Sequence, residues 1–149
     1  MRWNSGLAVV AAIMSTMGLA HADDMDQFGQ FKHHLLAGTR TTALLYAAKC
    51  DQSSGDKHNS PEIIGGFAID SFMNIQAPNE TIVFSNTHFT VHPDNAPVIE
   101  FVRYEVSADQ KAKISVKMLS PNTYEPIGEP RSFDCKLGEG LKFAYGASQ

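Results

Sequence analysis

Cysteine is scarce in this chain of 149 residues, which contains only Cys50 and Cys135. Neither has a second cysteine at CxxC spacing or a nearby histidine at metal-ligand spacing, so no zinc or redox motif is evident. Two cysteines in an oxidising compartment usually pair, and we therefore expect a Cys50–Cys135 disulfide. Free reactive thiols or a shared metal ion are the alternatives.

Basic residues do not dominate the charge. The sequence has 12 Lys and Arg against 16 Asp and Glu, which gives a formal net charge of −4 at pH 7. A mildly acidic domain lacks the basic stripe that nucleic acids require and the attraction that anionic membrane surfaces exert on cations. We expect neither nucleic acid nor a membrane surface as a partner.

Long apolar runs are missing after the first 22 residues. Residues 6–20 are uncharged and mostly apolar, but this run is short of the roughly 20 residues that span a bilayer. It follows Arg2 and precedes the small residues Ala20 and Ala22, which is the pattern of a secretory signal peptide. We expect residues 1–22 to be removed and 23–149 to fold as one exported domain, periplasmic or extracellular, with no stable membrane anchor.

Catalytic motifs are also missing. The sequence has no GxSxG, P-loop, HExxH or dinucleotide-binding pattern. Its carboxylates are dispersed, and none are paired in a way that suggests general acid–base catalysis. The sequence therefore predicts a protein that is not an enzyme and that uses no cofactor and no metal.

The apolar residues predict one helix followed by several strands. Between 24 and 36 they recur at three- and four-residue steps, and Gly38 is a natural stop. Turn signals separate short strands expected at 41–49, 65–73, 81–91, 98–106, 112–119, 132–137 and 141–145. This order predicts an α+β domain, in which an N-terminal helix packs on a twisted antiparallel sheet of about six or seven strands. Partial closure into a barrel is left open.

The alternation of apolar and polar residues differs between strands. It is regular over 111–119, where Lys111, Lys113 and Lys117 occupy one face that we expect to be exposed to solvent. Over 81–91 and 98–106 the apolar phase slips, which predicts either a β-bulge or burial on both faces.

Two histidines form the first weak candidate site. His88 and His92 are followed by Asp94. Residues four apart on a strand lie about 13 Å from each other, too far to share one zinc ion unless the strand bends. A structural or surface role is therefore favoured over metal binding.

Arg103, followed by Tyr104, forms the second weak candidate site. Arg103 lies in an otherwise apolar segment. It either makes an inward ion pair with an acidic residue or faces outward to recognise a carboxylate or phosphate, and we favour structural pairing. The candidate acidic partners are Glu100, Glu129 and Asp134.

Several stretches of this sequence are similar to one bacterial family. They are residues 86–91, Pro97, 100–106, Asp109, 124–129, 133–135 and 138–143, with Leu35–Gly38 and Lys49–Cys50 upstream. The chain resembles the VirK family, the Agrobacterium-type exported virulence-associated proteins, over nearly all of 23–149 except 51–61. The resemblance implies a small exported protein associated with virulence or host interaction, and its matching cysteines support the disulfide. It implies no reaction, cofactor or catalytic residue.

Three functions remain open at this point. We favour a non-catalytic exported protein that binds a protein partner. The alternative is a carrier of small apolar ligands, with a cavity in the curved sheet lined by Phe67, Phe84, Phe101 or Tyr104. A hydrolase that uses His88 or His92 with a carboxylate is the least favoured.

Overall fold

The structure, a computed structural model, describes residues 25–53 and 62–146. The expected signal peptide and residues 54–61 of the polar segment lie outside the described residues. The described elements are α1 (Gln27–Leu36), β1 (Thr41–Tyr46), a 3-10 turn η1 (Ala47–Lys49), β2 (Asp51–Gln52), β3 (Ile64–Ala68), β4 (Met73–Ile75), β5 (Thr81–Val91), β6 (Pro97–Ser107), β7 (Lys111–Leu119), β8 (Arg131–Lys136) and β9 (Leu141–Tyr145).

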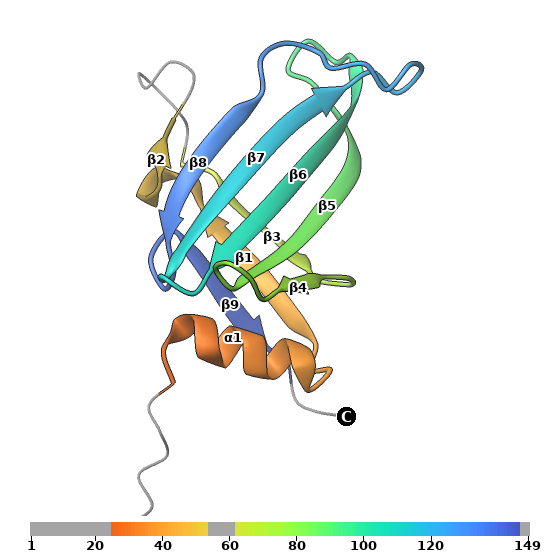
Figure 1. The fold of residues 1–149 in the computed structure, drawn as a ribbon. Coiled ribbons are helices and arrows are strands. Elements are labelled where there is room, and N and C mark those ends of the chain that lie inside the picture. The colour runs from red at the N-terminus through yellow and green to blue at the C-terminus, as the bar shows by residue number, and fades with distance from the viewer. Residues whose placement is uncertain (1–24, 54–61, 147–149) are drawn as a thin grey trace, which may run out of the picture.

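The strands form two antiparallel sheets. One has the order β2-β8-β7-β6-β5-β4 and the other the order β3-β1-β9. The small sheet lies behind the large one and α1 lies across one end of both (Figure 1). The predicted class, a helix packed on antiparallel strands, is confirmed, and the two sheets do not join into a closed barrel.

The strand count exceeds the expected six or seven because the shortest strands carry too little pattern to be recognised. β2 has two residues and lies in a segment that was expected to be a loop. The single strand expected at 65–73 is divided into β3 and β4, which belong to different sheets. The strand expected at 41–49 ends at Tyr46, where η1 begins.

The helix begins later than its apolar pattern suggests. The Asp26 carboxylate accepts a hydrogen bond from the backbone N–H of Gly29 at 2.7 Å, so Asp26 caps the helix and Gln27 begins it. Met25 is consequently 44% exposed. Phe28, Phe31 and Leu35 are buried against the sheets, as expected for the apolar face.

The apolar phase slip has one of its two expected causes over part of β5 only. β5 and β6 pair in unbroken register from Thr81↔Ser107 to Val91↔Pro97, so neither strand contains a bulge in this region. Burial on both faces is confined to the start of β5, where Ile82–Phe84 are all buried. Farther along, Phe89 and Val91 are exposed on the outer face.

The disulfide between Cys50 and Cys135 is confirmed. Cys50 lies between η1 and β2, next to Asp51, which pairs with Asp134 of β8, and Cys135 lies on β8 itself. The covalent bond thus fastens the connection between β1 and β2 to β8 at the edge of the large sheet. In the part of the chain that the structure describes, no helix has the length and apolar character needed to cross a membrane.

Candidate functional site

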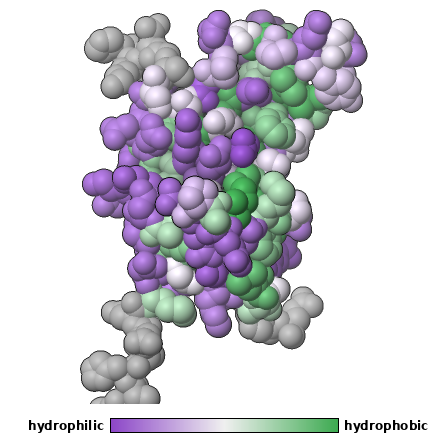
Figure 2. Space-filling model, in the orientation of Figure 1, coloured by the Kyte–Doolittle hydropathy of each residue, from purple (hydrophilic) through white to green (hydrophobic). Residues whose placement is uncertain are grey.

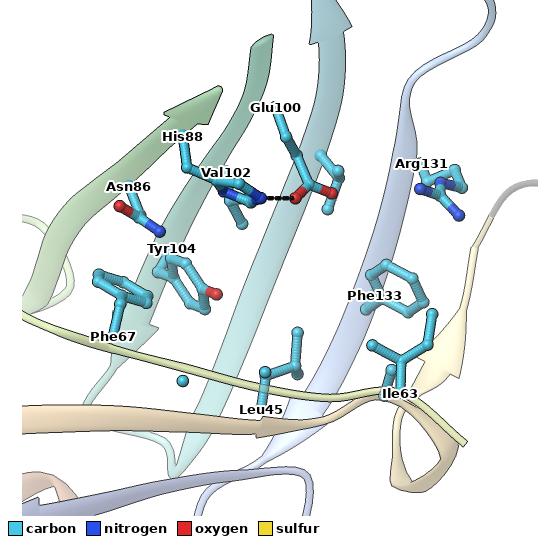
Figure 3. Close-up of a pocket in the computed structure, with 14 residues that line it drawn as sticks. Leu45, Ile63, Phe67, Asn86, His88, Glu100, Val102, Tyr104, Arg131 and Phe133 are labelled. Carbon is cyan, nitrogen blue, oxygen red and sulfur yellow. Dashed lines mark ion pairs between the residues drawn. The ribbon is translucent and has the colours of Figure 1, made fainter. Parts of the chain in front are cut away.

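A cavity of about 430 Å³ lies between the two sheets (Figure 3). We call it the inter-sheet cavity. From the β1 and β3 side it is lined by Leu45, Ala47, Ile63, Gly65, Gly66 and Phe67. From the large sheet it is lined by Asn86, His88, Glu100, Val102, Tyr104, Val116, Arg131 and Phe133. Its volume falls within the roughly 300–1,000 Å³ typical of small-molecule sites.

Gly65 keeps part of this space open. It pairs directly with Leu45, whose side chain lines the cavity, so both positions share the inner face of the small sheet. A Cβ added at Gly65 would meet no atom within 4 Å, whereas one at Gly66 would lie 2.8 Å from the Leu44 side chain. Gly65 therefore leaves an inward position of β3 without a side chain, and the space beside it is part of the cavity.

Tyr104 forms part of the cavity wall. Its ring stacks on Phe84 at 4.9 Å and lies 5.2 Å from the ring of Phe67. The residue is only 5% exposed, and its hydroxyl points into the cavity (Figure 3). The hydroxyl has no hydrogen-bond partner among residues 25–53 and 62–146. Burial, with a smaller effect from the charge of Glu100, raises the pKa of Tyr104 to about 12.

A histidine–carboxylate pair stands at the mouth of the cavity. His88 on β5 lies directly across from Glu100 on β6, and His88 Nε2 is 3.1 Å from Glu100 Oε2 (Figure 3). Arg131 approaches the cavity from β8, which is separated from β6 by β7. Arg131 is exposed and makes no ion pair with any described residue.

His92, the second histidine of the candidate pair, does not join His88. His92 Nδ1 lies 3.1 Å from Asp94 Oδ1 in the turn after β5. The same carboxylate oxygen accepts the Ala96 N–H at 2.9 Å, and this hydrogen bond is the main reason that the pKa of Asp94 is lowered. Within the described ranges, no three His, Cys, Asp or Glu side chains are grouped so that they could hold a metal ion.

Arg103 does not make the inward ion pair that we considered. It faces the outer side of the large sheet, and its Nη1 lies 3.3 Å from Glu105 Oε1 on the same strand. Both side chains are substantially exposed, so this pair contributes little to stability. The reason is strand parity: positions 100, 102 and 104 point inward, and 103 therefore points outward.

The outer face of the large sheet has a second notable feature, the open edge of β5. β4 pairs only with Thr81–Val83, and residues 84–91 of β5 have no strand beside them among the described residues. Phe89 and Val91 on this edge are 68% and 61% exposed. Apolar side chains interrupt the hydrophilic surface over the upper ends of β5 and β6 (Figure 2).

Sequence reasoning found only part of the cavity. Phe67 and Tyr104 line it as the carrier hypothesis supposed, but Phe84 packs under Tyr104 in the core and Phe101 faces outward. Gly65, Asn86 and Arg131 were not identified. A glycine at an inward position of an alternating strand was the available signal for Gly65, whereas the position of Arg131 depends on the register of β8.

Comparisons with known proteins agree on one family. The model of the family described as "VirK protein" matches residues 24–124. An uncharacterized protein from Sinorhizobium fredii is 29% identical over 116 residues, which is 78% of each chain. Another from the pinF2 3′ region of Rhizobium radiobacter is 32% identical over 79 residues, or 53% of each chain.

A solved structure shares the fold. The crystal structure of a VirK family protein from Legionella pneumophila matches with a TM-score of 0.68 at 22% identity. The match covers 79% of this chain and 95% of that one. At this identity the likeness shows the fold alone.

Proposed function

Because the chain belongs to the VirK family, we propose that it is an exported, non-catalytic, virulence-associated protein that acts by binding a partner protein. The observation that carries this proposal is the open edge of β5. We propose that the partner supplies an extended strand, which adds to this edge as a further strand of the large sheet.

The backbone of the open edge supports this choice of partner. A strand paired on one side only leaves a row of N–H and C=O groups that another extended segment can satisfy. Natural edge strands are usually protected by lysine, proline or bulges. Residues 84–91 contain no lysine, no proline, no glycine and no acidic residue, and their pairing with β6 has no bulge.

The side chains of the open edge support the same choice. Phe89 and Val91 lie on one face at alternate positions, so a strand added beside them would place its own apolar side chains next to them. The other sheet edges described here are shorter: β2 has two residues, β4 three, and β3 and β9 five each. β5 therefore offers the longest unprotected edge in the described structure.

The export component of the proposal rests on two features. Residues 1–22 have the charge, apolar run and small residues of a signal peptide, and the disulfide is typical of an oxidising compartment. Intact mass measurement of protein recovered from the periplasm tests this component. A disulfide-bonded chain that begins at Asp23 is expected, and a full-length chain confined to the cytoplasm would refute export.

The non-catalytic component is supported by the residues that line the cavity. The His88–Glu100 pair is an acid–base arrangement, but no serine, threonine or cysteine is among the described residues that line the cavity. A hydrolase that works through a covalent intermediate and uses His88 as its base would need such a nucleophile. Hydrolytic activity of the pure parent protein that is lost in the His88→Ala variant would contradict this component.

The partner-binding proposal is tested by cross-linking from defined positions. A photoreactive side chain placed at Phe89 should capture a partner in host-contacting cells. One placed at Leu36, which is 60% exposed on α1 at the other end of the molecule, should not. Amide hydrogen exchange of the purified complex should then show slower exchange across residues 84–91 than in the free protein. Equal capture from both positions, or unchanged exchange over 84–91, would rule out strand addition at β5.

A matched pair of substitutions separates binding from folding. Phe89→Lys places a charge at the open edge and should abolish partner capture, whereas Leu36→Lys should leave capture unchanged. Both side chains are exposed, so both variants should keep the thermal midpoint of the parent protein.

The inter-sheet cavity favours a second function, the carriage of a small ligand. The observation behind it is the combination of an apolar wall with open volume at Gly65. Binding of a simple amphiphile to pure protein, and its loss in Gly65→Phe, would support this function.

A further inference from the structure

We propose that the inter-sheet cavity binds an amphipathic carboxylic acid, with its apolar body between the sheets and its carboxylate held by side chains at the mouth. This inference rests on the carrier function proposed above and does not depend on the open edge of β5. It replaces the purely apolar ligand of the sequence-based hypothesis with one that carries a single anionic group.

The apolar residues of the cavity wall select an apolar body. Leu45 and Phe67 from the small sheet face Val102, Val116 and Phe133 from the large sheet. These side chains offer no hydrogen-bonding group, so a polar ligand atom placed among them would be desolvated without compensation. An alkyl or aryl group fits this environment.

Three side chains in the cavity wall offer hydrogen-bond donors without partners. The Tyr104 hydroxyl, the Asn86 amide and the Arg131 guanidinium all line the cavity, and none has a side-chain hydrogen bond or ion pair within the described residues. The Tyr104 hydroxyl opens onto the cavity, so it can donate a hydrogen bond to an acceptor oxygen of a ligand bound there.

The charges at the mouth favour an anion as the acceptor. Glu100 is the carboxylate that lines the cavity, and it already faces His88 at 3.1 Å. Arg131 is the cation without a carboxylate partner, and it lies two strands away from Glu100. Its planar guanidinium can donate two parallel hydrogen bonds to one carboxylate, which an alcohol or an amide cannot accept in that form.

Three probes with the same alkyl chain test the ligand class by isothermal titration calorimetry: decanoate, decanol and decylamine. We expect decanoate to bind most tightly, by about two- to fivefold over decanol, which is the range for an ion pair with an exposed partner such as Arg131. Tighter binding of decylamine than decanoate would overturn the proposal, because it would make Glu100 the recognition group. Equal binding of decanoate and decanol would overturn the anionic head group but leave the carrier function standing.

Substitutions test separately the contact with the ligand's carboxylate and the space for its apolar body. Arg131→Gln should remove the preference for decanoate over decanol and leave decanol binding unchanged, and Arg131→Lys should restore part of the preference. Gly65→Phe should abolish binding of all three probes by filling the cavity. Ala144→Phe adds the same ring at an exposed position on the outer face of the same sheet and should bind as the parent does.

These outcomes distinguish the two proposals. If none of the probes binds the parent protein, or if Gly65→Phe binds like the parent although it is folded by circular dichroism, the carrier function fails and this inference fails with it. If binding is lost in Gly65→Phe but Arg131→Gln keeps its preference for decanoate, the carrier function stands and the role of Arg131 is wrong.

Discussion

Phe31 of α1 stacks on Phe143 of β9, with ring centroids 3.7 Å apart and planes within 10° of parallel. The same ring meets Phe84 of β5 edge-on at 5.9 Å. Phe143 belongs to the small sheet and Phe84 to the large one, so a single helical side chain contacts both. Because Phe31 is completely buried, its whole ring packs α1 against the two sheets.

Phe31→Ala should lower the free energy of unfolding by about 3–5 kcal/mol, since it removes a buried ring and leaves a cavity between three elements. Phe89→Ala is the matched comparison, because Phe89 is 68% exposed and should cost about 0.5 kcal/mol or less. Urea denaturation followed by circular dichroism measures both. Similar losses in the two variants would show that the core is not organised around Phe31.

Gly140 packs directly against the disulfide. A Cβ at this position would lie 2.5 Å from Cys50 Sγ, 3.1 Å from the Cβ of Cys135 and 3.2 Å from the Lys49 carbonyl oxygen. Gly140→Ala should therefore destabilise the protein by about 1–3 kcal/mol through overpacking. Gly65→Ala, where the added methyl group meets nothing within 4 Å, should change stability by no more than about 1 kcal/mol in either direction. The prediction fails if the two alanine variants have the same thermal midpoint.

The disulfide joins residues 85 positions apart in the sequence. In the chain-entropy account, a loop of this length contributes about 4–5 kcal/mol by restricting the unfolded chain. The double variant Cys50→Ala/Cys135→Ala should lose most of this stability while it keeps the far-ultraviolet spectrum of the parent. An unchanged urea midpoint in the double variant, or reaction of the native parent with a thiol reagent, would contradict this expectation.

Alkaline pH should destabilise the protein through Tyr104. Burial raises the pKa of Tyr104 from 10.0 to about 12, so the folded state favours the neutral phenol more than the unfolded state does. The stability that Tyr104 contributes is fully present below pH 10 and is lost as the pH rises through about 12. Tyr104→Phe should flatten this alkaline decline in urea midpoint, and Tyr124→Phe, at a 69% exposed position, should not.

The sequence pattern predicted strand bounds well where turn residues flank the strand on either side. The strands expected at 81–91 and 141–145 coincide with β5 and β9, and the lysine face of β7 is exposed as anticipated. The pattern failed for β2 and β4, because two or three residues hold no periodicity. It also failed to separate the sheets, since the pairing of β1 with β9 joins residues about 100 apart, which local sequence does not encode.

The candidate site was harder to predict than the fold. His88 and Tyr104 were singled out, but their relation to the cavity depends on the register that sets each of them on the inner face. For Arg103, inward pairing and outward recognition were both left open, whereas strand parity points it outward, where it pairs with Glu105. Asn86 and Arg131 have no distinguishing local pattern, and only the arrangement of the sheets brings them to one cavity.

The pairing of β1 with β9 also governs when the chain can fold. Thr41 pairs with Tyr145, and Leu141 and Phe143 complete the core beneath α1. A nascent chain that still lacks its last few residues has no partner for one side of β1 and no ring to stack on Phe31. The native core therefore cannot be completed until the segment that contains β9 has been synthesised.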